Sequence, residues 1–118
     1  MKKVLLLISF AILFATFLVA DDGNVEDRSH VCMMQDMLMQ QPGIPLKHDG
    51  KTYYGCCEMC KDRIAQEPER YTKAVDPISG KTVDKAEAFL FAHQGTVFYF
   101  ESKETRAKFA KDPAKYRR

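Results

Sequence analysis

The sequence predicts an α+β fold made of two tandem units, each a β-hairpin followed by a helix, behind an apolar N-terminal segment. A stretch of 24 residues recurs 45 positions later, and its Gly, aromatic and Pro residues keep one register in both copies. A cluster of cysteines occurs only in the first copy. The chain has 118 residues, which leaves room for one small domain or two very small units after the N-terminal segment.

The N-terminus has the charge pattern of a secretory signal peptide. Lys2 and Lys3 precede an uncharged run, residues 4–20, and Asp21 ends that run. We therefore expect residues 1–20 to be a cleaved signal peptide and the folded part to be periplasmic or secreted. A run of this length is also close to what spans a bilayer, so the alternative is a membrane anchor formed by the uncleaved segment.

The charge balance argues against nucleic acid as a partner. The chain has 18 Lys and Arg against 16 Asp and Glu, and Lys2 and Lys3 account for the whole excess. A nucleic-acid-binding domain needs a basic footprint, which the nearly neutral remainder does not provide. The sequence also has no phosphate-binding loop and no nucleophile–base constellation, so we predict a binding protein and not an enzyme.

The recurring stretch indicates a tandem duplication. Residues 48–71 align without a gap on residues 93–116. Six aligned positions are identical, namely His48/His93, Gly50/Gly95, Tyr54/Tyr99, Ala65/Ala110, Pro68/Pro113 and Tyr71/Tyr116. We therefore expect one unit over residues 30–73 and a second over residues 74–118, with residues 21–29 as a flexible linker before them.

Each copy is expected to form the same short unit. A His-x-Gly turn, with Gly at positive φ, joins two strands, and a helix follows the aromatic residues of the second strand. Ser102 is the natural N-cap of the second helix, and Pro68 and Pro113 close the two helices. Tyr71 and Tyr116 are expected to fold back onto the hairpins. A unit of this size buries little core alone, so the two should pack together or one should be tied by metal.

Three of the four cysteines lie in the stretch YYGCCEMCKDRI, residues 53–64. The second copy replaces each of them, with Glu101 for Cys56, Ser102 for Cys57 and Thr105 for Cys60. The hairpin and helix pattern persists there without a cysteine, so the shape of the unit does not require the thiols. We therefore expect the cysteines to serve a chemical role in the first copy.

These residues resemble the YHS/TRASH domains, which are treble-clef-like heavy-metal modules. Cys32 matches the family's upstream cysteine, Cys56 and Cys60 match its Cys-x3-Cys pair at the helix start, and Met34 falls on its methionine. The resemblance implies two tandem treble-clef-like units, with Cys32, Cys56 and Cys60 as metal ligands. It also implies a role in metal trafficking, resistance or sensing, with a metal-transport or metal-accepting protein as a partner.

The second copy resembles the same family without its cysteines. It begins with DPISGKTV, residues 76–83, in which Ser79 stands in the place of the family's cysteine. It ends with KFAKDPAKY, which is close to the family's own ending. The first copy departs from the pattern at two positions, because Met33 replaces a glycine and Cys57 is an additional thiol.

The residue types themselves favour a soft-metal site. A hairpin exit and the first turn of a helix bring Cys56 and Cys60 together, and the upstream loop can deliver Cys32 as a third thiolate. Thiolate and thioether ligands prefer copper(I) or zinc, and four methionines within residues 32–39 favour copper(I). One ion per chain is expected. The fourth ligand is left open among Cys57, Met34, His30 and His48.

Two other roles are compatible with the same cysteines. Four cysteines in a small exported chain commonly form two disulfides, and the protein would then be a disulfide-stabilised interaction module without catalysis. Cys57 and Cys60 also fit a Cys-x-x-Cys redox pair, although no βαβ pattern surrounds them. The methionines could be core residues. His48 precedes the turn Gly as His93 does, which favours a structural role for it.

Overall fold

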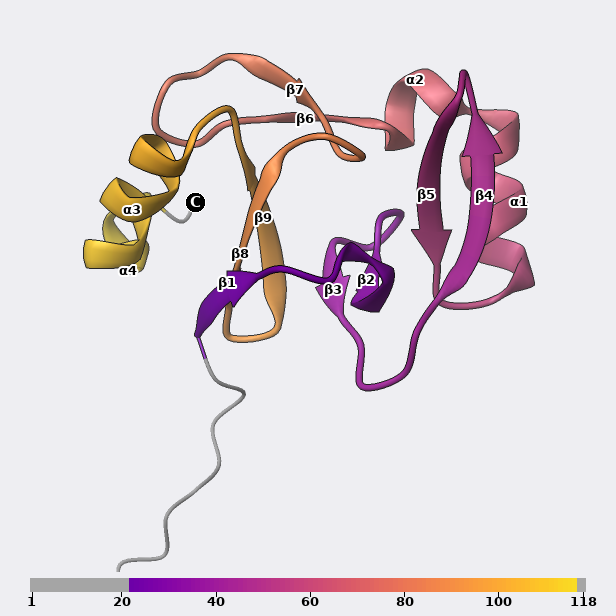
Figure 1. The fold of residues 1–118 in the computed structure, drawn as a ribbon, viewed down its shortest axis with the longest axis horizontal. Coiled ribbons are helices and arrows are strands. Elements are labelled where there is room, and N and C mark those ends of the chain that lie inside the picture. The colour runs from indigo at the N-terminus through magenta and orange to yellow at the C-terminus, as the bar shows by residue number, and fades with distance from the viewer. Residues whose placement is uncertain (1–21, 117–118) are drawn as a thin grey trace, which may run out of the picture.

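Residues 22–116 are described by a computed structural model, in which short antiparallel sheets and four helices form a mixed α/β structure (Figure 1). The expected signal peptide lies outside the described residues. Among residues 22–116, no helix is long and apolar enough to cross a membrane.

The same four elements occur twice, with every boundary displaced by 45 residues. In the first copy they are β4 (Ile44–His48), β5 (Lys51–Gly55), α1 (Glu58–Gln66) and α2 (Pro68–Tyr71). In the second copy they are β8 (Phe89–His93), β9 (Thr96–Phe100), α3 (Lys103–Lys111) and α4 (Pro113–Tyr116). The predicted repeat of hairpin and helix is thus present in the structure.

Both hairpins turn through two residues at positive φ. The φ angles are 50° and 74° at Asp49 and Gly50, and 51° and 82° at Gln94 and Gly95. A two-residue turn with positive φ at both positions matches the right-handed twist of the flanking strands. The prediction was right for the glycines, but it missed that Asp49 and Gln94 share the left-handed conformation.

The helix ends are marked by the capping and proline residues that the sequence predicted. Ser102 caps α3, and its hydroxyl accepts the Thr105 N–H at 3.1 Å. Cys57 holds the matching N-cap position of α1 and makes no capping hydrogen bond. Pro68 and Pro113 each stand just beyond a long helix and begin the short helix that follows, because proline lacks the N–H that a helix interior needs.

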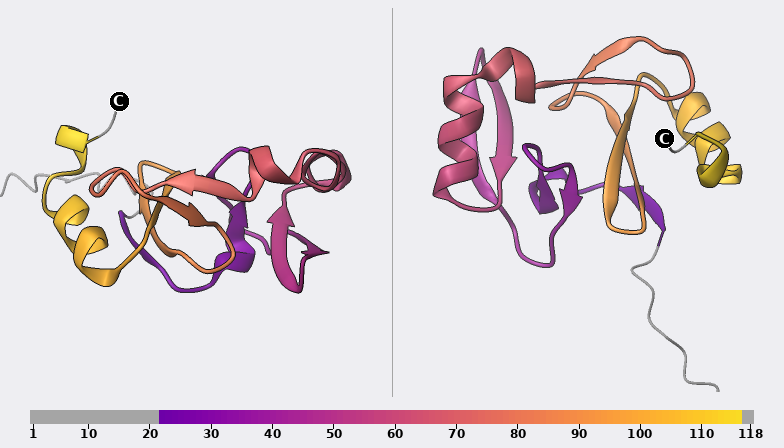
Figure 2. Two further views of the ribbon diagram at one scale, coloured as in Figure 1. Left: turned by 90° about the horizontal axis from the view of Figure 1, so that it is seen from above. Right: turned by 180° about the vertical axis from the view of Figure 1, so that it is seen from behind.

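The five-stranded sheet is built around the second hairpin, whereas β4 and β5 of the first copy form a two-stranded sheet of their own. Strands β1 (Gly23–Val25), β2 (Val31–Cys32) and β3 (Met37–Leu38) join the second hairpin in the order β1-β8-β9-β3-β2. A separate ribbon of β6 (Lys73–Val75) and β7 (Thr82–Asp84) runs across the molecule between the two long helices, which lie at opposite ends (Figures 1 and 2). The strand that carries Cys32 is therefore attached to the second copy.

The sequence predicted a flexible linker over residues 21–29, of which the structure describes residues 22–29. From Asp22 onward they are engaged with the second copy, because β1 pairs with β8 and the Arg28 guanidinium donates to the carbonyls of Lys85 and Ala88 at 2.8 and 3.1 Å. Asp27 caps a 3₁₀ helix, Arg28–His30. This polar stretch has no hydrophobic period, so its partners far along the chain could not be read from the sequence.

Two apolar clusters form the interior. The larger one joins both copies and contains Val31, Met33, Tyr53, Ile64, Tyr71, Ala88, Leu90, Ala92, Val97 and Tyr99. The smaller one surrounds Phe109 and includes Phe91 and Phe100, with Phe98 and Tyr116 partly buried against it. Tyr71 and Tyr116 thus pack onto the hairpins as expected, Tyr71 in the larger cluster with Tyr53 and Tyr116 against the smaller cluster with Phe98.

Asp84 links the first hairpin to the β6–β7 ribbon. Its carboxylate accepts hydrogen bonds from the Tyr53 hydroxyl at 2.8 Å and from the Lys51 and Lys73 ammonium groups at 3.1 Å each. Burial alone would raise the pKa of Asp84, but the Ala86 N–H and these three side chains outweigh it and lower the pKa to about 2.

Stability should therefore fall in acid in a way that Asp84 controls. A carboxyl whose pKa is lowered on folding stabilises the protein above its unfolded pKa, and this stabilisation is lost as the pH falls toward its folded pKa. The Asp84 side chain is 9% exposed, so we expect a loss of about 2 kcal/mol between pH 5 and pH 2. Urea unfolding across that range should show this extra loss in the native protein and not in Asp84→Asn. Parallel curves for the two proteins would contradict the role given to Asp84.

Candidate metal centre

Three cysteine sulfurs converge where the first hairpin ends and α1 begins. The Sγ atoms of Cys32, Cys56 and Cys60 all lie within 4.8 Å of one another, and those of Cys56 and Cys60 are 3.3 Å apart. Cys32 and Cys60 are buried, whereas Cys56 is exposed. All four cysteines, which lie within the described residues, are free thiols.

A glycine lets the hairpin exit approach the helix closely. A Cβ atom on Gly55 would stand 2.8 Å from the Lys61 nitrogen and 3.1 Å from the Cys60 Cβ. A larger residue would therefore push β5 away from the first turn of α1 and separate Cys56 from Cys60. The second copy has Phe100 at this position, where the ring fills the smaller apolar cluster.

Backbone N–H groups hold the Cys32 sulfur in a polar nest. Burial raises the pKa of Cys32, but the N–H groups of Gln35, Cys56 and Met34 face its sulfur and outweigh burial, so that the pKa is lowered. A sulfur surrounded in this way is prepared to carry negative charge. Cys32 is the natural first ligand of a cation in this cluster.

The other two sulfurs hold their protons more tightly. Burial, followed by the neighbouring Cys56 and Cys57 sulfurs, raises the pKa of Cys60 well above its ordinary value. The Cys60 thiol favours the thiolate of Cys56, but burial and the Cys32 sulfur prevail, and the pKa of Cys56 is raised. A metal ion that binds here would have to displace protons from both residues.

The spacing of the three sulfurs suits a soft metal ion. With a metal–sulfur distance of about 2.3 Å, the ligands of a tetrahedral site lie about 3.8 Å apart, and those of a planar three-coordinate site about 4.0 Å apart. The observed separations are compatible with these values, at 3.3 Å for Cys56 and Cys60 and no more than 4.8 Å for the pairs with Cys32. Small side-chain rotations would suffice, so the three cysteines could hold a metal ion, whose identity the geometry does not select.

Cys57 lies at the outer edge of the cluster. Its Sγ is 3.9 Å from that of Cys56, and the side chain is exposed at the start of α1. The nearby N–H of Cys60 lowers the pKa of Cys57. Cys57 therefore offers an accessible sulfur next to the three-sulfur group without belonging to it.

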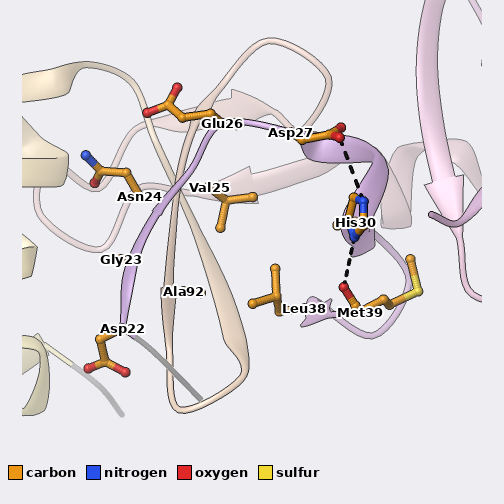
Figure 3. Close-up of a pocket in the computed structure, with 10 residues that line it drawn as sticks. All are labelled: Asp22, Gly23, Asn24, Val25, Glu26, Asp27, His30, Leu38, Met39 and Ala92. Carbon is orange, nitrogen blue, oxygen red and sulfur yellow. Dashed lines mark hydrogen bonds and ion pairs between the residues drawn. The ribbon is translucent and has the colours of Figure 1, made fainter. Parts of the chain in front are cut away.

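His30 belongs to a different hollow. This open cavity of about 400 Å³ has the apolar residues Val25, Leu38 and Ala92 in its lining, and none of the four cysteines lines it (Figure 3). The His30 ring lies between Asp27 and Met39, with Nδ1 3.1 Å from the Met39 carbonyl oxygen (Figure 3). The structure therefore does not bring His30 into the group of three sulfurs.

His48 lies away from the cysteines, and Met34 packs against the larger apolar cluster. His48 pairs with Lys51 beside the hairpin turn, while Cys56 follows the other end of β5, about 13 Å of strand away. The Met34 side chain packs against the larger apolar cluster, and it is the backbone N–H of Met34 that faces the Cys32 sulfur. His48 therefore lies apart from the three cysteines.

Met37 is a candidate that the sequence did not single out. It stands directly opposite Cys32 in the β2–β3 pair and is 49% exposed. Opposite residues of an antiparallel pair place their side chains on the same face, so Met37 lies on the face of the sheet that carries Cys32. Met33, in contrast, is fully buried in the core. The pairing of β2 with β3, which the sequence does not show, is what places Met37 opposite Cys32.

The second copy has a carboxylate where the first has Cys32. Asp76 is fully buried and accepts four hydrogen bonds. Their donors are the N–H groups of Ile78 at 2.7 Å, Ser79 at 3.1 Å and Glu101 at 2.9 Å, and the Thr105 hydroxyl at 2.7 Å. Met34, Gln35 and Cys56 provide the matching N–H groups around Cys32. Both copies thus hold an acidic side chain in the same nest.

This correspondence corrects the alignment around Ser79. The sequence suggested that Ser79 replaces the family's cysteine, but Ser79 is exposed and its hydroxyl accepts the Lys81 N–H at 3.3 Å. Asp76 makes the contacts of Cys32 instead, and Thr105 approaches it from the position of Cys60. In the second copy, the buried Asp76 carboxylate thus accepts all of these hydrogen bonds from backbone and side-chain groups of the same copy.

Comparisons of this chain with family models, with curated proteins and with solved structures gave no match.

Proposed function

We propose that this chain is an exported protein that binds one soft metal ion, with copper(I) favoured and zinc as the alternative. The observation that carries the proposal is the convergence of the Cys32, Cys56 and Cys60 sulfurs from two separate segments. Thiolates select soft ions such as copper(I) and zinc over magnesium or calcium. The resemblance to YHS/TRASH domains adds a role in metal trafficking, resistance or sensing, without catalysis.

Exposed sulfur-containing side chains around the cysteine cluster favour a protein that carries the metal ion and passes it on. Met37 and Met59 are two of the three exposed large apolar side chains among the described residues, and Met59 lies between Cys57 and Cys60 in sequence. Cys57 would serve as an exchange ligand, because its accessible sulfur neighbours Cys56. The partner would be a metal-transport or metal-accepting protein that presents sulfur ligands of its own.

Metal analysis of protein purified under reducing conditions tests the proposal. We expect one ion per chain in the native protein and none in the Cys56→Ser/Cys60→Ser double variant, because a lone Cys32 cannot hold the ion. Cys57→Ser should keep the stoichiometry and slow the transfer of the ion to a competing dithiol. An unchanged metal content in the double variant would refute the site.

The competing function is a disulfide-stabilised interaction module. It uses the same four cysteines, and the distance of 3.3 Å between the Cys56 and Cys60 sulfurs shows that this pair is close enough to be oxidised. Cys32 and Cys57 would then have to form the second bridge or stay free. The metal proposal is favoured because the cysteines are confined to one copy of a unit that folds in the same way without them.

A further inference from the structure

The loop that follows Cys32 is held by buried side chains of the second copy. Lys85 Nζ donates to the Met33 carbonyl at 2.6 Å and to Asp36 Oδ1 at 2.7 Å. The Tyr99 hydroxyl donates to the same Asp36 oxygen at 2.8 Å. Lys85 and Tyr99 are each 3% exposed. We call this set of Asp36, Lys85 and Tyr99 the Asp36 clamp.

The backbone of Asp36 is tied to the same hairpin. Asp36 has a φ of 54°, and its carbonyl accepts the Val97 N–H of β9 at 2.7 Å. The preceding residue, Gln35, provides one of the N–H groups that face the Cys32 sulfur. The conformation that aims this N–H at Cys32 is therefore held from the second copy, while Cys56 and Cys60 belong to the first.

Lys85 is unusual because its side chain is buried. Lysine is almost never fully buried unless it is paired, because its desolvation is costly. The buried Lys85 ammonium group donates hydrogen bonds to Met33 and Asp36, which are the two ends of one short loop. The contact thus fixes the loop at both ends, and the Met33 N–H, which donates to the Tyr54 carbonyl at 2.9 Å, links the same loop to the strand that leads to Cys56.

We infer that Asp36, Lys85 and Tyr99 are positioning residues of the metal site, through which the cysteine-free copy holds Cys32 in place for the ion. The inference rests on the proposed function. The second copy, which has no cysteine, contributes to metal binding in this way by orienting Cys32. Groups that orient metal ligands from outside typically change metal affinity about 10- to 100-fold when they are removed.

The test loads the full chain with copper(I) under anaerobic, reducing conditions and measures two quantities. Competition with a chromogenic copper(I) chelator gives the affinity, and alkylation followed by peptide mapping shows which cysteines the ion protects. In Tyr99→Phe and Asp36→Gly we expect affinity to fall about 10- to 100-fold. Cys32 should become alkylatable while Cys56 and Cys60 stay protected. Glycine tolerates the positive φ of Asp36, so this variant removes the carboxylate without backbone strain.

Two further variants separate positioning from general stability. Asp36→Asn keeps an acceptor for Lys85 and Tyr99 and should restore most of the affinity. Tyr53→Phe is the matched control, because it also deletes a hydroxyl that donates to a carboxylate, at Asp84; it should leave Cys32 protected.

The outcomes distinguish the two proposals. Cys32 protected as in the native protein in both Tyr99→Phe and Asp36→Gly, at native affinity, would overturn the clamp and leave the metal site standing. A native protein in which neither copper(I) nor zinc, loaded in parallel, protects any cysteine would overturn the proposed function, and the clamp with it.

Discussion

Replacing Phe109 with alanine should lower the free energy of unfolding by about 3–5 kcal/mol. The Phe109 side chain is fully buried, and its ring contacts those of Phe98, Phe100 and Phe91 at centroid distances of 4.7, 5.2 and 5.8 Å. Tyr116 packs on it at 6.3 Å. Alanine would leave a cavity at the centre of the smaller apolar cluster, between the second hairpin and α3.

Chemical denaturation monitored by far-UV circular dichroism measures this loss. Phe109→Leu serves as the control, since it keeps most of the volume and should cost less than about 1.5 kcal/mol. The repeat places Phe109 at the position of Ile64, which is buried in the larger cluster. A cost below about 1 kcal/mol for Phe109→Ala would mean that this helix does not pack on its hairpin as described.

Replacing Asp76 with alanine should also destabilise the protein, by at least about 3 kcal/mol, since each buried donor left without a partner costs roughly 1–3 kcal/mol. The variant leaves the N–H groups of Ile78, Ser79 and Glu101 and the hydroxyl of Thr105 unpaired. Asp76→Asn keeps one carbonyl oxygen in the nest and should be intermediate between alanine and the native residue.

The protonation of Asp76 gives an independent check. Burial raises the pKa of Asp76, but the Glu101 N–H, the Thr105 hydroxyl and the loop N–H groups outweigh burial and lower the pKa. Its stabilisation is therefore present above the unfolded pKa of about 3.8 and is lost as the pH falls through the folded pKa. Urea unfolding near pH 7 and pH 3 should show a smaller acid loss in Asp76→Asn than in the native protein. Equal losses would show that Asp76 is not ionised in the nest.

The repeat could be predicted because its signals are local. Turn glycines, the N-cap Ser102 and the two prolines act within a few residues of their own positions, so their register appears directly in the sequence. The convergence of Cys56 and Cys60 is also local, since it depends on a hairpin exit and one helical turn. These parts of the fold and of the candidate site agree with the sequence analysis.

The remaining features depend on contacts between distant segments. The pairing of β1 with β8 was missed, because nothing in a short polar stretch near Asn24 indicates its partner. Ser79 looked like the replacement for Cys32 by letter order, whereas the hydrogen-bond donors show that Asp76 takes that place. Nothing in the sequence around Lys85 and Tyr99 indicates that these residues contact Asp36. Their contacts with Asp36 exist only because the N-terminal strands join the sheet of that copy.

Counting thiols by alkylation and mass measurement tests the central claim most directly, on protein isolated from the compartment that the proposed export predicts. We expect the cysteines to be reduced and capped by metal, so that Cys32, Cys56 and Cys60 react only after a chelator has removed the ion. Structural disulfides, in contrast, resist reduction and leave no thiol to alkylate. Two intact disulfides with and without the chelator would contradict the metal site and establish the disulfide-stabilised module in its place.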